Sequence, residues 1–269
     1  MSNIVITGST QGIGLGLAKA FSDLGHSVAI CGRSQATLES ALAELANTPG
    51  NCIGKLCDIS NTDDIQSLWD FAKNAFGSID IWINNAGFAR TTEQIIDYSI
   101  DDVDKMINTN LKGNIYALQI AVKGMLAQEH GKIFNILGGG SNGEYFPGMG
   151  VYGSTKRGLD YVTDALVKEL KDTPLIIGKV RPGMVVTEAI IREIHEDPDN
   201  FHKNRKMMNI LSDSVDTVCP YLVNRMLNCQ KSGSKISWLS GGKITWRMLS
   251  ASFRKPEDKF PQIAARSPS

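Results

Sequence analysis

The chain has 269 residues, of which 42% are hydrophobic and 21% charged, a composition that fits a folded globular protein and excludes a disordered chain. The charges of its 28 basic and 28 acidic residues cancel, so no overall positive potential favours the binding of nucleic acid. No apolar run reaches the ~18 residues of a transmembrane helix, no basic signal region opens the chain, and the five cysteines form no Cys-x-x-Cys pair. We expect a reduced, cytoplasmic chain without a metal site.

Short apolar runs alternate with helical patterns along the chain. The runs predicted as strands are 4–7, 27–31, 52–56, 79–83, 132–137, 175–180 and 235–239. The predicted helices are 13–24, 35–46, 63–75, 100–128 and 152–171. Most of the runs are apolar throughout, as in strands covered on both faces. The alternation predicts an α/β fold, a single doubly wound domain whose parallel sheet is flanked by helices.

Two segments depart from this alternation. Residues 188–215 are charged, lie between the last two predicted strands, and are long enough to act as a substrate lid. Residues 240–269 form a C-terminal tail in which cations and aromatic residues mix. This tail either lies on a membrane surface, packs on a sister subunit, or borders the substrate pocket.

A glycine-rich loop joins the first strand to the first helix. Gly8, Gly12 and Gly14 have the spacing G-x-x-x-G-x-G, which differs from the dinucleotide motif G-x-G-x-x-G. Residues without a Cβ allow a tight turn, and the helix N-terminus attracts a phosphate. An ordinary turn would explain the same glycines.

The end of the second strand indicates which nucleotide binds. NAD-dependent enzymes place Asp or Glu there to bind the ribose 2′-hydroxyl, whereas this strand is followed by Arg33 with no carboxylate beside it. A guanidinium can pair with a 2′-phosphate, so NADP(H) is favoured over NAD(H) unless Arg33 is an ordinary surface residue.

Four further motifs follow in order: Asn-Asn-Ala-Gly at 84–87, Asn-Thr-Asn-Leu at 108–111, Tyr-x-x-x-Lys at 152–156, and Pro-Gly at 182–183 ahead of Thr187. With these motifs the chain resembles the short-chain dehydrogenase/reductase family from residue 3 to about residue 240. The resemblance implies a Rossmann-type sheet of seven strands, a homodimer or homotetramer, and a small-molecule substrate that is a carbonyl compound or an alcohol.

Tyr152 and Lys156 carry the predicted chemistry. Four residues apart on a helix, they share a face, and an ammonium near a phenol favours the phenolate. Tyr152 can then exchange a proton with a carbonyl oxygen while a nicotinamide exchanges hydride. The resemblance implies that Lys156 also holds the nicotinamide ribose and that Asn110 anchors a water in the proton relay.

The resemblance also assigns the cofactor-binding positions. Asp58 would meet the adenine, although Asp58 could equally cap the next helix. The expected cofactor-binding set is Gly8, Ser9, Gln11, Gly12, Ile13, Gly14, Arg33, Asp58, Ile59, Asn85, Ala86, Gly87, Tyr152, Lys156, Pro182, Gly183, Val185 and Thr187.

The sequence departs from the family at the catalytic serine. That serine stands thirteen residues before the tyrosine, where this chain has Gly139, and the nearest hydroxyl is Ser141. Three explanations are open. Ser141 takes the role after a bulge of the glycine run, backbone N–H groups replace the serine, or catalysis is weak or lost.

A narrower resemblance concerns the chlorophyll b reductase branch of the family. It rests on Gly-Gly-Gly-Ser at 138–141, Val-Tyr-Gly-Ser-Thr-Lys at 151–156 and Pro-Gly-Met-Val at 182–185. It implies at most a bulky apolar aldehyde or ketone, such as the formyl group of a chlorophyll b-type pigment. We therefore expect an NADP(H)-dependent oxidoreductase, the alternatives being a regulatory or scaffold protein that binds NADP(H) and, on the same fold, a dehydratase or epimerase.

Overall fold

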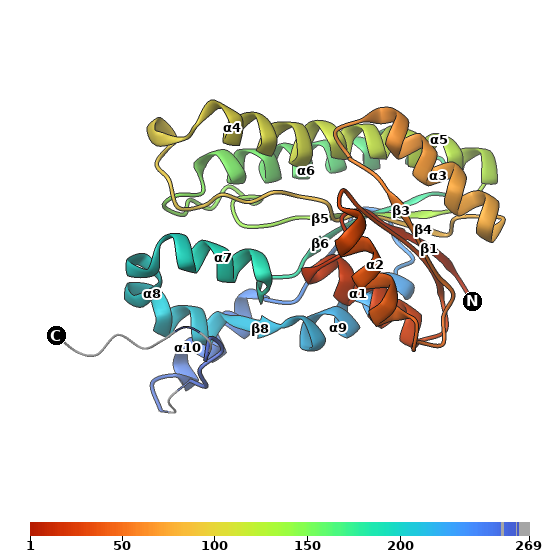
Figure 1. Ribbon diagram of the computed structural model, residues 1–269. Helices are drawn as coiled ribbons and strands as arrows, with labels where there is room; N and C mark the ends of the chain where they lie inside the picture. The colour runs from red at the N-terminus through yellow and green to blue at the C-terminus, as the bar shows by residue number, and fades with distance from the viewer. Residues whose placement is uncertain (254–255, 262, 264–269) are drawn as a thin grey trace.

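All seven runs expected as strands pair in one parallel sheet in the computed structural model, which describes residues 1–253, 256–261 and 263 (Figure 1). The sheet order is β3-β2-β1-β4-β5-β6-β9. The strands are β1 (Asn3–Ile6), β2 (Ser27–Gly32), β3 (Cys52–Leu56), β4 (Ile81–Asn84), β5 (Lys132–Ile136), β6 (Ile176–Arg181) and β9 (Ser234–Ser237). The order reverses between β1 and β4, where open α/β sheets bind ligands at the carboxyl ends of the strands.

Helices cover both faces of the sheet. On one face lie α1 (Gly12–Asp23), α2 (Gln35–Leu45) and α9 (Val215–Leu227); on the other lie α3 (Thr62–Phe76), α5 (Asn114–Gln128) and α6 (Gly150–Glu169) (Figure 1). The two resulting cores include Phe21 and Leu222 on the first face, and Trp69 and Met125 on the second. Because both faces are buried, the strands are apolar throughout rather than alternating. The predicted fold class is confirmed.

The predicted helix 100–128 is interrupted. It consists of α4 (Ile100–Met106), a π-helical segment at Ile107–Gly113 and α5. Single π-helical turns within α-helices occur frequently at functional sites. This one contains Asn110, whose side chain is completely buried.

Helix α6 is fixed to the sheet by polar contacts, of which all but the one to Asp164 are largely buried. Lys179 of β6 places its Nζ 2.7 Å from a carboxylate oxygen of Asp160 and 2.7 Å from one of Asp164. The Asn135 amide of β5 donates to Thr163 Oγ1 at 2.8 Å and accepts from Asn84 of β4 at 2.8 Å. Buried groups hydrogen-bonded in this way specify a single position for the helix that carries the predicted acid/base pair.

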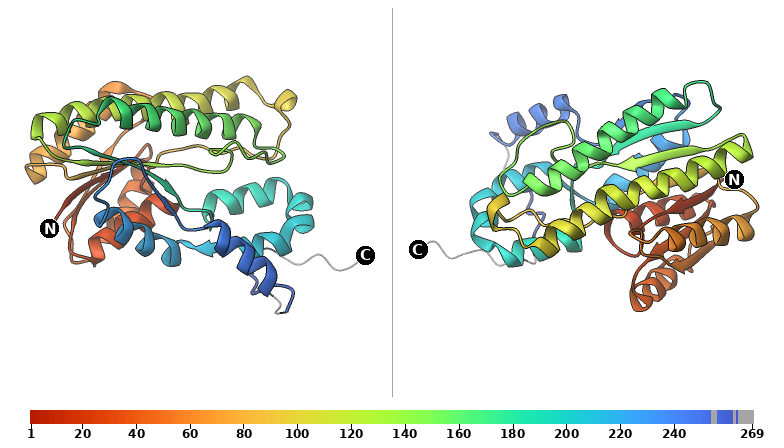
Figure 2. Two further views of the ribbon diagram at one scale, coloured as in Figure 1. Left: turned by 180° about the vertical axis from the view of Figure 1, so that it is seen from behind. Right: turned by 90° about the horizontal axis from the view of Figure 1, so that it is seen from above.

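Residues 184–214 extend beyond the carboxyl ends of the strands, at one end of the molecule (Figure 2). They form β7 (Met184–Val186), α7 (Glu188–Glu196), α8 (Pro198–Leu211) and β8 (Ser212–Ser214), and β7 pairs with β8. A short 3-10 turn, η1 (Ile95–Asp97), precedes α4, and α10 (Gly241–Ser250) follows β9. No helix within the described residues is long and apolar enough to cross a bilayer.

Candidate active site

The glycine loop is attached to the end of β4 by hydrogen bonds. Asn85 Nδ2 donates to the carbonyl oxygens of Thr7 and Gly8 at 3.0 and 2.8 Å, and Thr7 Oγ1 accepts from the backbone N–H groups of Asn85 and Ala86 at 3.1 Å each. A Cβ on Gly8 would lie 2.7 Å from the Ala86 Cα, and Gly8 has a φ of +59°. Thus Asn85 organises the loop, which only glycine can form at position 8.

The N-terminus of α1 fits a phosphate group. The side chain of Gln11, the N-cap residue, makes no capping bond, and no described residue accepts from the N–H groups of Gly12, Ile13 or Gly14. Ser9 lies below the loop, where its Oγ donates to the Ile6 carbonyl at 2.6 Å and accepts from Cys31 N–H at 3.0 Å. Free N–H groups at the positive end of a helix bind anions, so these residues fit the cofactor's pyrophosphate.

Arg33 lies beside the same loop. The Thr10 side chain packs so closely on Gly32 that a Cβ there would approach it to 2.6 Å. This contact sets the exposed Arg33, the next residue, at the border of the loop, with no ion pair to another described residue. Its guanidinium is available to an anionic group.

The predicted catalytic residues converge at the end of β4. A Cβ on Gly87 would lie 3.4 Å from Asn110 Oδ1 and 3.6 Å from Lys156 Nζ. Lys156 Nζ donates to the Ile136 carbonyl at 3.1 Å and lies 5.7 Å from the centroid of the Tyr152 ring. The side-chain amide of Asn110 hydrogen-bonds to the backbone of Phe88: Oδ1 accepts from the Phe88 N–H at 2.7 Å, and Nδ2 donates to the Phe88 carbonyl at 2.8 Å. The structure therefore brings Tyr152, Lys156, Asn110 and Gly87 together.

The protonation of this pair differs from the sequence-based expectation. Burial raises the pKa of Tyr152 above its usual range, and the nearby Glu193 carboxylate raises it further. Burial also lowers the pKa of Lys156 to about 8. Without cofactor, desolvation therefore outweighs the expected effect of the ammonium on the phenol. Tyr152 is a neutral phenol at neutral pH, the form that donates a proton.

The glycine run forms a turn in which Ser141 N–H donates to the Gly138 carbonyl at 3.3 Å and Gly140 has a φ of +81°. A Cβ on Gly138 would touch the Tyr152 hydroxyl, so position 138 faces the phenol. Ser141 is fully buried, its Oγ has no partner among the described residues, and its carbonyl accepts from Arg157 at 3.1 Å. The structure does not bring this hydroxyl into hydrogen-bonding distance of Tyr152.

The other predicted cofactor positions differ in what they can contribute. Asp58 Oδ1 accepts from the N–H and hydroxyl of Ser60 at 2.9 and 2.7 Å, while Asn61 caps α3, so the capping alternative for Asp58 is wrong. Ile59 and Val185 are buried in the cores and offer only backbone groups. Pro182 and Gly183 lie in the turn between β6 and β7, and Thr187 caps α7 while facing Gly12.

Glu193 in α7 belongs to none of the motifs in the sequence and was not predicted as a site residue. Its Oε2 accepts from Thr91 Oγ1 at 2.7 Å, and its buried Oε1 has no partner in the described part of the chain. Burial raises the pKa of this carboxyl. A second contact joins α7 to the same loop, since Arg90 Nη1 lies 3.3 Å from Glu196 Oε2. Together these contacts hold α7 against the loop that follows β4, close to Tyr152.

Comparisons with known proteins agree with the fold and with the family resemblance. The family model described as short chain dehydrogenase matches residues 2–198. A solved actinorhodin polyketide ketoreductase with NADPH superposes with a TM-score of 0.77 at 25% identity, over 89% of this chain and 97% of that one.

Two curated relatives come from Oryza sativa subsp. japonica. Chlorophyll(ide) b reductase NOL, chloroplastic, is 34% identical over 92% of this chain and 74% of its own length. A probable chloroplastic chlorophyll(ide) b reductase is 32% identical over 94% of this chain, which spans 53% of that protein. The chain is thus about half the length of the second relative.

Proposed function

The chain belongs to the short-chain dehydrogenase family, and from this premise we propose that it is an NADP(H)-dependent oxidoreductase that interconverts a carbonyl compound and an alcohol. The observation that carries the proposal is the convergence of Tyr152, Lys156 and Asn110 near the N-terminus of α1, whose first N–H groups have no acceptor among the described residues. The direct test follows NADPH oxidation at 340 nm with a panel of aldehydes and ketones. Cofactor binding without turnover of any of them would support the scaffold alternative.

In the proposed reaction the bound cofactor supplies or receives the hydride. The neutral Tyr152 phenol donates its proton to the oxygen that becomes the hydroxyl group. Lys156, next to it, orients the nicotinamide ribose, and its positive charge favours the phenolate left after proton transfer. Asn110 lies in the π-helical segment between α4 and α5 and bonds to the backbone of Phe88, and the proposed relay water would lie against that segment. Arg33 and the N-terminus of α1 would hold the phosphates.

The proposed substrate is a bulky apolar aldehyde or ketone. Support comes from the two relatives named as chlorophyll(ide) b reductases, so the formyl group of a chlorophyll b-type pigment is one candidate.

We also propose that residues 188–215 act as the lid of a single domain spanning residues 1–269, that the protein is a homodimer or homotetramer, and that it works in the cytoplasm.

Arg33→Ala should weaken NADPH binding by about 10- to 100-fold, because the 2′-phosphate would lose a charge-assisted hydrogen-bond partner. NADH affinity should hardly change, since NADH lacks that phosphate. Titration of each cofactor by isothermal calorimetry measures both affinities. Arg225→Ala, an exposed arginine on α9, is the control. Equal affinity of the unmodified protein for NADPH and NADH would contradict the assignment.

Glu193→Gln should shift the pH profile of alcohol oxidation to lower pH. Oxidation needs the Tyr152 phenolate as base, and the Glu193 carboxylate raises the pKa of Tyr152, so removing the charge lowers that pKa. The measurement is kcat/KM for alcohol oxidation against pH. Glu196→Gln, on the same helix, should leave the profile in place because Glu196 pairs with Arg90 instead. Coincident profiles for Glu193→Gln and the unmodified protein would refute this coupling.

A further inference from the structure

Helix α10 directs its charged residues toward the protein. Arg247 Nη2 lies 2.7 Å from Asp213 Oδ2, and its Nη1 donates to the Ile210 carbonyl at 3.3 Å. Lys243 Nζ lies 3.0 Å from the centroid of the Trp238 ring. No residue of α10 is buried. The side that an ordinary amphipathic helix turns toward solvent is here the side that contacts the rest of the fold.

The opposite side of α10 is apolar and exposed. Trp246 and Leu249 are three residues apart and lie on one side of the helix, and Phe253 lies in the turn that follows it. Their exposed fractions are 71%, 58% and 88%. Met248 of α10 and Met207 of α8 are also exposed. Both line an open hollow between the two helices, beside this stripe. We call Trp246, Leu249, Phe253, Met248 and Met207 the α10 face. Nothing in the described part of the chain covers it, and an exposed apolar area of this kind marks an interaction site.

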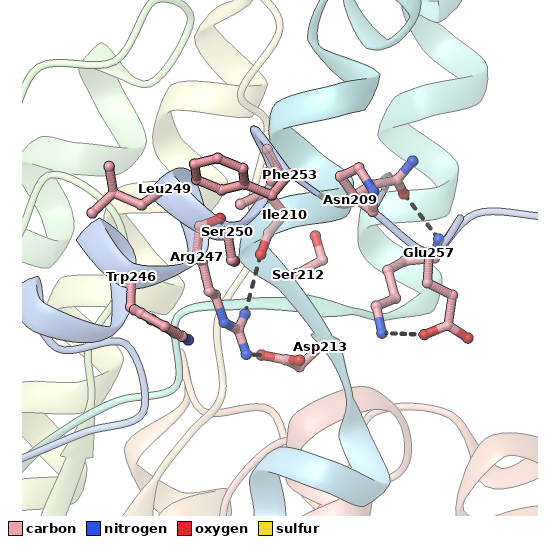
Figure 3. A pocket seen from close by; sticks show the side chains of 13 residues that line it. Asn209, Ile210, Ser212, Asp213, Trp246, Arg247, Leu249, Ser250, Phe253 and Glu257 are labelled. Carbon is pink, nitrogen blue, oxygen red and sulfur yellow. Dashed lines mark hydrogen bonds and ion pairs between the residues drawn. The ribbon is translucent and has the colours of Figure 1, made fainter.

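Figure 3 shows the neighbouring hollow, of about 640 Å³, between α10, the end of α8 and residues up to 259. Trp246, Leu249 and Phe253 stand around it, and Arg247 and Asp213 pair at its base. Neither Tyr152 nor Lys156 lines this hollow. The α10 face is therefore separate from the catalytic residues.

The charges around the α10 face are predominantly positive. The acidic residues bordering it are paired within the fold: Asp213 with Arg247, Glu257 with Lys259 at 2.9 Å, and Asp258 with Arg205 at 2.6 Å. Lys203 and Lys206 of α8 are exposed and form no ion pair with another described residue. The occupant of this face should thus be apolar and anionic.

We propose that the α10 face binds the surface of a membrane containing anionic phospholipid, with Trp246, Leu249 and Phe253 at the boundary of headgroups and acyl chains and Lys203 and Lys206 against lipid phosphates. A single helix at the edge of the molecule suits a flat surface, since a protein partner would need a matching groove (Figure 2). Tryptophan and lysine are well suited to such a boundary because each has an apolar body and a polar end. The observations behind this proposal do not include the catalytic residues, so it stands or falls separately from the proposed enzyme activity.

The test uses the full chain with vesicles of phosphatidylcholine alone or with phosphatidylglycerol added. Sedimentation should show binding to the anionic vesicles only, and brominated lipid should quench Trp246, because Trp69 and Trp82 are buried and Trp238 is half-buried. The double variant Leu249→Ser, Phe253→Ser should bind at least about tenfold more weakly. Lys203→Gln with Lys206→Gln should weaken binding to anionic vesicles, and the binding that remains should fall less steeply as salt is added.

The matched control is Ile96→Ser with Tyr161→Ser, which removes two apolar side chains of 86% and 74% exposure at other sites and should bind like the unmodified protein. Unchanged cofactor binding would show that each variant is folded. The proposal is overturned if the unmodified protein stays in the supernatant or if the Leu249, Phe253 double variant binds normally. It is equally overturned if light scattering shows that this double variant dissociates an oligomer, since the α10 face would then be a protein interface.

Discussion

Tyr152→Phe should lower kcat for carbonyl reduction by roughly 10²–10⁴-fold, the range that a positioned general acid contributes. The substitution removes only the hydroxyl group that donates the proton, and the ring keeps its place beside Lys156. Cofactor affinity and KM should change little, because the proton moves in the transition state and not on binding. Steady-state kinetics with NADPH and the best carbonyl substrate measure the loss.

Tyr161→Phe provides the control for this loss. Tyr161 lies on the same helix, α6, but is 74% exposed, so its hydroxyl group should be dispensable. If Tyr152→Phe kept more than a tenth of the unmodified activity while binding cofactor normally, another group would have to supply the proton. Neutral Glu193, which burial makes easier to protonate, would then be the next candidate.

The sheet could be predicted from the sequence because its strands are buried on both faces and therefore read as continuous apolar runs, such as Ile4 to Ile6. The helices after residue 187 could not. Helix α7 buries only Ile194, α8 buries only Phe201, and α10 buries no residue, so none of the three resembles the helices that pack a broad face on the sheet. Helix α9 does bury one face, but Pro220 lies inside it, and proline usually ends a helical pattern.

The candidate site could be predicted where its residues lie close together in the sequence. Tyr152 and Lys156 share a helix, and the glycine loop has its own spacing, so all can be recognised locally. Glu193 could not be recognised, because its position beside Tyr152 depends on how α7 folds back over the strand ends. The role of Asn85 in bonding the loop likewise depends on β4 lying next to β1. Such long-range neighbours leave no spacing pattern in the sequence.

Gly138→Ala should reduce kcat by about 10²-fold, the cost of displacing a reacting group by about 1 Å. The added methyl group would clash with the Tyr152 hydroxyl, which would have to move. Gly139→Ala is the matched control, since its methyl group would meet the flexible end of Met149, 2.7 Å from Cε, and that side chain can shift. Kinetics and NADPH titration on both variants compare the two positions.

Kinetics and NADPH titration on a Ser141→Ala variant decide which group polarises the substrate carbonyl. Ser141 remains one proposal for this role, and its loss would then cost roughly 10²–10³ in rate. The geometry favours the second proposal, the N–H groups of the glycine run, because Gly138 faces the phenol and no described residue accepts from the N–H of Gly138 or Gly139. On that account Ser141→Ala should retain activity and be as stable as the unmodified protein or more so, since it removes a buried hydroxyl without a partner. A large loss of kcat with unchanged cofactor affinity would instead show that the turn opens and brings Ser141 to the substrate.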